Sequence, residues 1–487
     1  MPHELERFKH LLLALGRERG DDLAVEGAKE RFTYKQLLAE VWLRAKALSE
    51  RRAGVLVLAL DNGPELLFWD LAALVSGRAC VIVPTFFSMA QVHHCIEQCG
   101  ASLVLCQDAW EGVISQLGFV QQDAFWARDL AAPVELPEGT AKVTYTSGST
   151  GTPKGVCLGA DAMLRVAHEL ELASRPTEPQ RYLAVLPLGV LLENLGVYAA
   201  LMAGASVLLY PQAQLGMGGA SQVDFKRLLG AIALSRAQSL ILVPQLLMGL
   251  VTAIERGGMQ VGPLRFVAVG GARVSPALLA RAEAIGLPVF EGYGLSECAS
   301  VVALNRPGAM RCGSVGRPLP HVQVRIAEDG EVLVMGSVLL GYLGEPPASS
   351  AWWATGDLGY FDDDGYLYLN GRKKHQFITS FGRNVNPEWV EAELTQNGVI
   401  AQAFVHGEGL PRNMALLWPL DPGATDEVIE QAVQRCNATL PDYARVHAWR
   451  RLPGPLTPDA HTLTANGRPR REAILQRYHT LLSDIPL

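Results

Sequence analysis

Short apolar runs alternate with amphipathic helical patterns through much of the chain. The runs are rich in Val, Ile and Leu and occupy residues 54–60, 79–84, 101–106, 182–188, 206–210, 239–244, 266–271 and 288–294. Strands that alternate with helices form parallel sheets whose faces the helices cover. Because these runs are apolar on both faces, they have the pattern of buried parallel strands. The sequence therefore predicts an α/β fold built on parallel sheets flanked by helices.

The pattern changes from about residue 313 onward. Two segments alternate apolar and polar residues around the dipeptides Asp329-Gly330 and Asp364-Gly365. Asp-Gly between alternating runs is a strong signal for a hairpin turn. We therefore expect short antiparallel strands here, in a small β-barrel-like region.

The length of 487 residues also predicts more than one domain. Hydrophobic cores stop growing at roughly 250 to 300 residues, and longer chains split. A compact α+β pattern follows Lys374. We expect a large domain over residues 1–370, a hinge over 371–375 and a small α+β domain over 376–487.

Charge and cysteine content exclude several classes of protein. The net charge of −7 gives no general attraction for a polyanion, so a nucleic-acid partner is not expected. Eight cysteines in so long a chain indicate free thiols rather than a disulfide scaffold. One stretch has metal-ligand chemistry but lacks the second ligand pair of a structural zinc site, and it contains His93, His94, Cys95 and Cys99.

Apolar stretches long enough for export or membrane insertion are not evident. The N-terminal apolar run is shorter than the roughly 7 to 15 residues of a signal-peptide core. The longest uncharged apolar stretch, 195–210, is shorter than the ~20 residues of a membrane span. It is broken at Gly204, which predicts a buried helix, a glycine stop and a strand. We expect a cytoplasmic protein without a transmembrane segment.

A loop of small, hydroxyl-bearing and basic residues follows the strand pattern at 142–146. Its sequence is SGSTGTPKG, residues 147–155. Glycines let backbone amides approach an anion, hydroxyls add donors and Lys154 adds a positive charge. The phosphate loop of nucleoside triphosphatases does not fit, because that motif needs Lys directly after Gly and before Ser or Thr. The loop therefore indicates a phosphate site of another kind.

The segment TSGSTGTPKG (146–155) resembles the phosphate loop of the adenylate-forming superfamily, closest to acyl-CoA synthetases and fatty acyl-AMP ligases. Three further motifs match in order along the chain: EGYGLSE (291–297), TGD (355–357) and GRKK (371–374). The resemblance implies ATP, Mg²⁺ and coenzyme A or phosphopantetheine as cofactors. It also implies that the small domain is mobile and rotates between two half-reactions.

Individual roles follow from the same resemblance. Tyr293 lies against adenine, Glu297 holds Mg²⁺, and Asp357 binds the ribose. The nucleotide-binding set is Thr146, Ser147, Gly148, Ser149, Thr150, Gly151, Gly271, Ala272, Glu291, Gly292, Tyr293, Gly294, Ser296, Asp357, Arg372 and Lys374. The catalytic residues are Lys154, Glu297 and Arg468, and Lys374 is the hinge residue.

Arg468 marks a departure from the family pattern. The segment LTANGRPRRE (463–472) resembles the family's Gly-Lys motif, but Arg468 stands at the lysine position. Residues 375–487 contain no Lys, so the small domain offers only arginines for this task. Arg keeps the charge and can fork two donors onto oxygen atoms, although it is bulkier than Lys.

The resemblance implies that a carboxylic acid is converted to acyl-AMP and that the acyl group then passes to the thiol of coenzyme A. Two alternatives stay open: loading of the phosphopantetheine of an acyl carrier protein, and a non-catalytic acyl-nucleotide binder. The segments 187–205 and 298–302 are expected to select the acyl group. The first is apolar except for Glu193 and Asn194, which favours a fatty or small aromatic acid.

Overall fold

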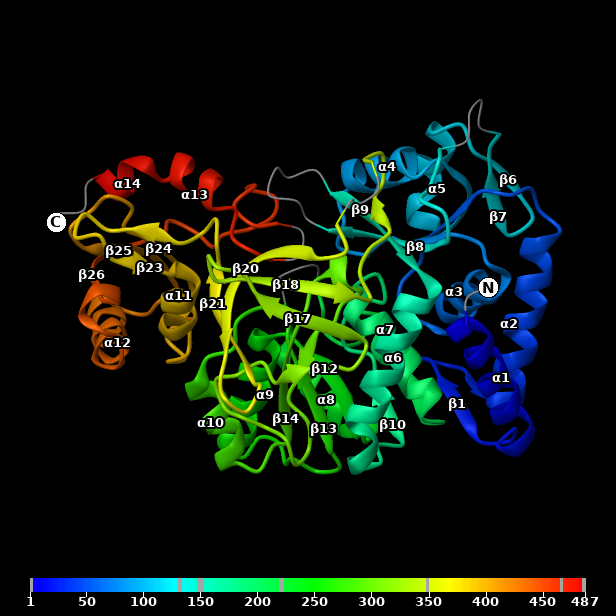
Figure 1. The fold of residues 1–487 in the computed structure, drawn as a ribbon, viewed down its shortest axis with the longest axis horizontal. Helices are drawn as coiled ribbons and strands as arrows, with labels where there is room; N and C mark the ends of the chain where they lie inside the picture. The colour runs from blue at the N-terminus through cyan, green and yellow to red at the C-terminus, as the bar shows by residue number, and fades with distance from the viewer. Residues whose placement is uncertain are drawn as a thin grey trace.

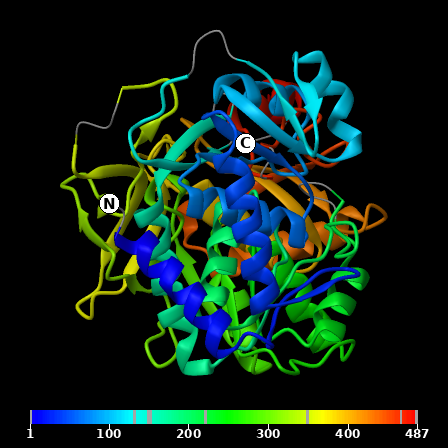
Figure 2. The same ribbon diagram turned by 90° about the vertical axis from the view of Figure 1, so that its right-hand side faces the viewer.

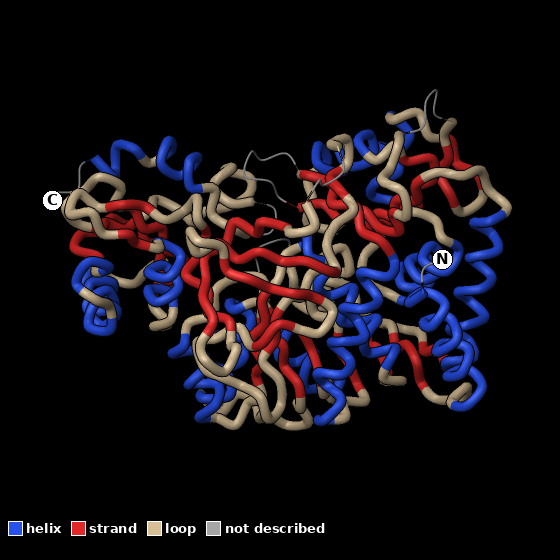
Figure 3. The backbone as a smooth tube through the Cα atoms, in the orientation of Figure 1, coloured by secondary structure: helices blue, strands red, loops and turns tan. Residues whose placement is uncertain are grey.

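The computed structural model describes residues 3–129, 134–146, 153–218, 223–346, 350–464 and 467–483. It has a large N-terminal part built on two big sheets and a smaller C-terminal part at one end of the molecule (Figure 1). Figure 3 shows the strands gathered centrally, with helices covering them. The predicted α/β fold with a large and a small domain is therefore confirmed. The domain boundaries at 370 and 376 stay predictions.

The first sheet includes the strands whose carboxyl ends lie at the candidate site. Its order is β16 (Arg317–Pro318), β15 (Ala303–Leu304), β14 (Val289–Tyr293), β13 (Phe266–Val269), β12 (Ser239–Leu242), β10 (Arg181–Leu183), β11 (Ser206–Leu208), β1 (Leu23–Glu26) and β2 (Arg31–Thr33). The strands from β14 to β1 pair in parallel, as the apolar runs predict. The edge strands β2, β15 and β16 are antiparallel.

The second sheet has the same design of a parallel centre and antiparallel edges. Its order is β19 (Gly341–Tyr342), β9 (Lys154–Gly159), β8 (Thr140–Thr146), β4 (Cys80–Ile82), β3 (Val55–Ala59), β5 (Ala101–Cys106), β7 (Phe125–Ala127) and β6 (Val120–Gln122). Strands β8 and β9 form an antiparallel pair in which Thr146 faces Lys154. The pairing holds the two ends of the predicted phosphate loop next to each other.

The region expected to resemble a barrel contains a four-stranded antiparallel sheet. Its order is β17 (Val322–Ile326), β18 (Glu331–Gly336), β20 (Trp353–Phe361) and β21 (Leu367–Arg372). The C-terminal part has a two-stranded and a three-stranded sheet. Their strands are β22 (Phe377–Ile378), β23 (Asn384–Val385), β24 (Ile400–His406), β25 (Asn413–Pro419) and β26 (Val446–Arg451).

Fourteen helices lie in the described residues, and three short 3₁₀ turns accompany them. The helices are α1 (His3–Glu18), α2 (Tyr34–Ser49), α3 (Pro64–Ser76), α4 (Met89–Gln98), α5 (Asp108–Gln116), α6 (Ala160–Ser174), α7 (Leu191–Met202), α8 (Phe225–Ser235), α9 (Pro244–Glu255), α10 (Pro276–Ala284), α11 (Pro387–Thr395), α12 (Asp426–Thr439), α13 (Arg471–Arg477) and α14 (His479–Ser483). The 3₁₀ turns are η1 (Arg175–Thr177), η2 (Ser296–Cys298) and η3 (Asp442–Ala444). Figure 2 shows α1 and α2 on the face opposite the C-terminal part.

Helices α3 and α7 are buried almost all round, in the core shared by the two large sheets. A helix that is apolar on every side must be enclosed in this way. The C-terminal part has cores of its own, centred on residues such as Val390, Val405 and Phe404. Separate cores in the two parts agree with the expectation from chain length.

One buried ion pair ties the central elements together. The Lys142 ammonium of β8 donates to Asp70 Oδ1 of α3 at 2.7 Å, and the two side chains are 5% and 0% exposed. Asn194 and Tyr198 of α7 complete the cluster, because both donate to Asp70 Oδ2. Buried charges persist only when they are paired and hydrogen-bonded. The cluster therefore fixes α3, α7 and β8 relative to one another.

The free cysteines agree with the expectation from sequence. All eight cysteines are unpaired. Within the described ranges, no helix is long and apolar enough to cross a bilayer. In the same residues no three His, Cys, Asp or Glu side chains gather as a metal site, so His93, His94, Cys95 and Cys99 form no such cluster.

Candidate functional site

The candidate site lies at the carboxyl ends of β13 and β14, where the C-terminal part meets the large one. Strand β13 is followed by Gly270 and Gly271, and β14 ends at Tyr293. Ligands of open α/β sheets bind beyond the carboxyl ends of parallel strands. The third sheet brings Asp357 and Arg372 to the same place.

Asp357 stands at the centre of this arrangement. The Tyr293 hydroxyl donates to Asp357 Oδ2 at 2.6 Å, and Arg372 Nε lies 2.8 Å from Oδ1. Asp357 and Arg372 are register partners on β20 and β21, so their side chains are neighbours by strand pairing. Burial raises the pKa of Asp357, while Arg372 and the Tyr293 hydroxyl partly offset that increase. Three residues named from separate motifs are thus in direct contact.

Glu297 lies close by, on the 3₁₀ turn η2. Its Oε1 accepts a hydrogen bond from the Tyr342 hydroxyl at 2.8 Å, and its backbone carbonyl accepts one from Leu339 at 2.7 Å. Gly294 is needed just before the turn, because a Cβ there would lie 1.6 Å from the Ser300 carbonyl oxygen. The chain therefore passes close enough to itself to present Ser296 and Glu297 together.

Lys154 begins β9 and lies near the end of the predicted phosphate loop. Its ammonium lies 3.0 Å from Glu345 Oε1 and 5.1 Å from the centre of the Tyr342 ring. Thr146 ends β8 on the other side of the loop. The intervening predicted residues Ser147, Gly148, Ser149, Thr150 and Gly151 lie outside the described residues.

Arg468 reaches the large part from the C-terminal part. Its Nη2 donates to the Gly271 carbonyl oxygen at 2.9 Å, beside Ala272. Gly271 has a φ of 82°, a left-handed conformation that glycine adopts without strain. Two hydrogen bonds join the Arg468 backbone to Thr464.

The charges around Arg468 affect the pKa of its guanidinium. Arg468 remains exposed to solvent, but desolvation by the surrounding protein lowers its pKa and the Arg372 charge lowers it further, while the charges of Glu388, Asp357 and Glu297 raise it. An arginine guanidinium stays protonated at neutral pH under such influences. Arg468 is therefore a fixed positive charge that interacts electrostatically with the carboxylates of two motifs, Asp357 and Glu297.

The neighbouring arginines are used differently. Arg471 pairs with Glu391 at 2.8 Å and also donates to the Val405 carbonyl, both inside the C-terminal part. Arg470 has a buried Nε without a hydrogen-bond partner among the described residues. Among the described residues, Arg468 is the arginine of this segment that hydrogen-bonds to the large part.

Several predicted residues have a more structural setting. Glu291 is buried, and burial raises its pKa to about 8 while the Arg273 charge opposes the increase. Gly292 pairs with Leu304 in the sheet. Lys374 is exposed just beyond β21, whereas its neighbour Lys373 is tied to Asp329 at 2.6 Å.

The polar residues of the predicted acyl segment are engaged internally. Glu193 accepts hydrogen bonds from the Tyr182 hydroxyl and, at 2.8 Å, from the Leu186 amide. Burial raises the pKa of Glu193 to about 8, although these bonds oppose the increase. Asn194 belongs to the cluster around Lys142 and Asp70. The described side chains of α7 thus offer no free charge.

Sequence reasoning did not find Tyr342 or Glu388. Tyr342 follows an apolar run, and nothing in the local sequence marks it as a site residue. Glu388 lies in the first turn of α11, its Oε1 is 2.6 Å from His375 Nδ1, and its charge raises the pKa of Arg468. Only the tertiary structure shows that both side chains approach the site.

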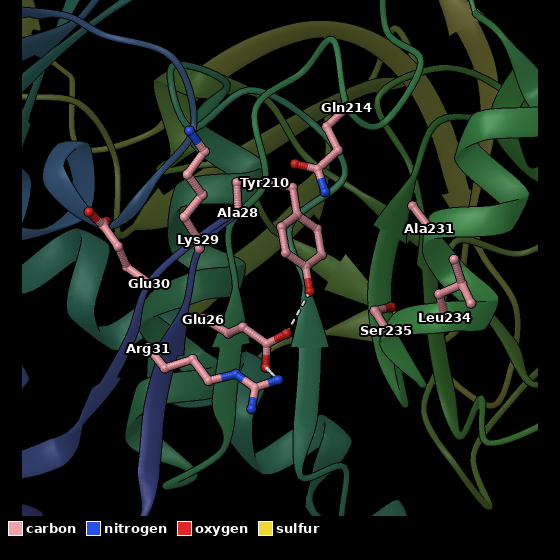
Figure 4. A pocket seen from close by; sticks show the side chains of 11 residues that line it. Glu26, Ala28, Lys29, Glu30, Arg31, Tyr210, Gln214, Ala231, Leu234 and Ser235 are labelled. Carbon is pink, nitrogen blue, oxygen red and sulfur yellow. Dashed lines mark hydrogen bonds and ion pairs between the residues drawn. The ribbon is translucent and has the colours of Figure 1, made fainter.

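A separate surface pocket of about 350 Å³ contains none of these residues. It lies between the β1–β2 hairpin and α8 (Figure 4). There Glu26 accepts a hydrogen bond from the Tyr210 hydroxyl at 2.9 Å and pairs with Arg31 at 3.4 Å. The residues predicted from the motifs therefore lie outside this pocket.

Comparison with known proteins agrees with this geometry. The model of the family described as "AMP-binding enzyme" matches residues 14–343, and that of the "AMP-binding enzyme C-terminal domain" matches residues 374–485. A 2-succinylbenzoate–CoA ligase of Bacillus velezensis is 29% identical over 403 residues, which cover 78% of this chain and 79% of that protein. The long-chain-fatty-acid–CoA ligase FadD15 of Mycobacterium bovis is 28% identical over 422 residues, covering 69% and 68%.

Solved structures share the fold. The anthranilate CoA ligase AuaEII in complex with anthranoyl-AMP superposes with a TM-score of 0.82 at 19% identity, covering 98% of both chains. This likeness extends over both the large and the small part.

Proposed function

The chain belongs to the AMP-binding enzyme family, and from that premise we propose that it is an ATP-dependent ligase that converts an apolar carboxylic acid to its acyl-AMP and then transfers the acyl group to the thiol of coenzyme A. The observation that carries the proposal is the contact of Arg468 with Gly271, beside Asp357 and Arg372. It brings a cation of the C-terminal part to the carboxyl ends of the strands.

The first half-reaction is attack of the substrate carboxylate on the α-phosphorus of ATP, with pyrophosphate as leaving group. Its main obstacle is repulsion between two anions. Arg468 can offer two donors to carboxylate and phosphate oxygens, and Lys154 provides a second positive charge beside the predicted phosphate loop. Preorganised charges of this kind are usually the largest catalytic contribution.

Glu297 fits a magnesium-binding role. Magnesium prefers one or two carboxylates together with phosphate oxygens and water. Glu297 is a partly exposed carboxylate with one oxygen already fixed by Tyr342. The metal would supply neutralisation of the triphosphate charge, and Glu297 would hold it.

Asp357 suits recognition of a ribose, because a carboxylate accepts hydrogen bonds from two neighbouring hydroxyls. Arg372 and Tyr293 hold the carboxylate in place from both sides. We further propose that residues 371–375 act as the hinge and that the small domain turns between the two half-reactions. Hinge closure of this kind is a common way to assemble a site from two domains.

The setting of α7 supports an uncharged, apolar acyl group. Glu193 and Asn194 are the polar residues of the predicted acyl segment that could meet a charged substrate. Both already form hydrogen bonds with other residues of the protein. An apolar acyl chain gains about 0.8 kcal/mol per buried CH₂ group. This supports a fatty or simple aromatic acid over an amino acid. Coenzyme A is the acceptor named in the two curated relatives, with carrier-protein phosphopantetheine as the alternative thiol.

A panel of carboxylic acids tests the proposal. The enzyme is incubated with ATP, Mg²⁺ and each acid, and pyrophosphate is measured before coenzyme A is added. We expect acid-dependent pyrophosphate release with apolar acids and AMP release that rises with coenzyme A. Release of ADP and inorganic phosphate, or pyrophosphate release that does not depend on any acid, would contradict the proposal and indicate another reaction. Nucleotide binding without any turnover would favour a non-catalytic acyl-nucleotide binder.

A further inference from the structure

Tyr342 connects the two charged groups that flank the predicted phosphate site. Its hydroxyl donates to Glu297 Oε1 at 2.8 Å. The ammonium of Lys154 lies over its ring, 5.1 Å from the ring centre. One side chain therefore contacts both groups: its hydroxyl binds the Glu297 carboxylate, and its ring lies against the Lys154 ammonium.

The backbone around Tyr342 is fixed at both sides. Tyr342 lies on β19 and pairs with Val156 of β9, the strand that begins at Lys154. The Leu339 amide donates to the Glu297 carbonyl at 2.7 Å. The segment 339–342 therefore contacts Glu297 through its main chain and through the tyrosine hydroxyl.

Lys154 and Tyr342 each make one further side-chain contact. The ion pair of Lys154 with Glu345 joins side chains that are both 48% exposed, and exposed pairs hold their partners loosely. The Tyr342 ring is packed edge-to-face against Trp353, with ring centres 5.9 Å apart. Burial and the Glu297 charge raise the pKa of Tyr342, so its hydroxyl remains a donor at neutral pH.

We propose that Tyr342 is a positioning residue of the adenylation site, whose hydroxyl orients the Glu297 carboxylate for a metal ion and whose ring orients the Lys154 ammonium for phosphate. The proposal rests on the proposed function. Carboxylates that bind metal ions are themselves usually hydrogen-bonded, and loss of such a partner typically costs about 10- to 100-fold in metal affinity or activity. The hydroxyl thus affects metal binding, and the ring affects nucleotide binding with or without metal.

The test measures binding rather than turnover. Isothermal titration calorimetry compares the intact enzyme with Tyr342→Phe, using α,β-methylene-ATP, which cannot release pyrophosphate. Each titration is done with Mn²⁺ and again in EDTA. Tyr342→Phe is expected to weaken binding of the Mn²⁺-nucleotide complex by about tenfold or more. Metal-free binding is expected to stay at the wild-type level, because the ring remains.

Three further variants separate positioning from a general structural effect. In a Glu297→Gln background, Tyr342→Phe is expected to cause no further loss, because coupled residues are not additive. Tyr342→Leu also removes the ring and is expected to weaken metal-free binding. Tyr360→Phe is the matched control, since Tyr360 is exposed and stacks on Tyr368.

The proposal is overturned if Tyr342→Phe binds the Mn²⁺ complex as the wild type does. It is also overturned if Tyr342→Phe weakens nucleotide binding equally with and without metal, or if its effect on binding adds to that of Glu297→Gln. In these cases acid-dependent pyrophosphate release by the wild type would leave the proposed function standing. If the wild-type enzyme binds no nucleotide either with Mn²⁺ or in EDTA, both the role of Tyr342 and the proposed function are wrong.

Discussion

Replacing Arg468 by Ala should slow adenylation far more than acyl transfer. The change removes the donor to Gly271 and the positive charge that faces Asp357, Glu388 and Glu297. In the first half-reaction two anions must approach each other, so this charge is needed there. In the second half-reaction a thiolate attacks an acyl-AMP that is already formed, and the same charge contributes less.

The structure also indicates the size of the effect. Among the described residues, Arg468 makes one side-chain hydrogen bond to the large part, and removing one donor aimed at developing charge typically costs about 10²- to 10³-fold in rate. We therefore expect acyl-AMP formation to fall by about that factor. Arg468→Lys should lie between Ala and the wild type, because it keeps the charge but loses the forked donors.

The assay measures the two half-reactions separately. Pyrophosphate release is followed in a single turnover without thiol, and thioester formation is followed from synthetic acyl-AMP and coenzyme A. Arg477→Ala is a suitable control, because the Arg477 guanidinium contacts Ala460 within the C-terminal part. Unchanged adenylation in Arg468→Ala would refute the assignment and direct attention to Arg470, whose Nε has no hydrogen-bond partner among the described residues.

Other changes give distinct expected outcomes. Glu297→Gln should nearly abolish pyrophosphate release without altering the circular dichroism spectrum, because the amide keeps the shape but loses the charge; normal turnover would remove Glu297 from the site. Lys374→Pro fixes φ near −65° and removes a donor, so it should impair one half-reaction much more than the other, and equal losses would count against the hinge. Burial raises the pKa of Glu193 to about 8, so the folded protein favours the protonated carboxyl. The contribution of this carboxyl to the free energy of unfolding is fully present below its pKa in the unfolded chain, and it is lost as the pH rises to about 8. The melting temperature should therefore fall less between pH 5 and 8 in Glu193→Gln than in the wild type, and equal slopes would contradict this.

Local patterns predicted much of the secondary structure. The apolar run 195–210 contains the end of α7, a glycine with a φ of 69° at Gly204, and β11. The run 54–60 contains β3, and the run 101–106 coincides with β5. Side-chain periodicity and glycine positions determine such elements locally.

Some short strands were not predicted. Strands β1 and β19 are four and two residues long, and their partners β11 and β9 lie far away in the sequence. Strand formation in such segments depends on neighbours more than on intrinsic preference. The sequence pattern therefore could not identify them.

The same distinction applies to the candidate site. Tyr293, Asp357 and Arg372 were named from motifs, and the structure places them in contact. The contacts of Tyr342 with Glu297 and of Arg468 with Gly271 join residues 45 and 197 positions apart. Such contacts depend on how whole sheets and domains pack, which motif spacing does not specify.

Detection of an enzyme-bound acyl-adenylate tests the central claim most directly. The protein is incubated with ATP, Mg²⁺ and an apolar acid from the panel, without any thiol, and the bound fraction is analysed by mass spectrometry. We predict a mass equal to the acid plus AMP less one water, which disappears with release of AMP when coenzyme A is added. Bound ATP that remains intact, or ADP as the product, would contradict the account.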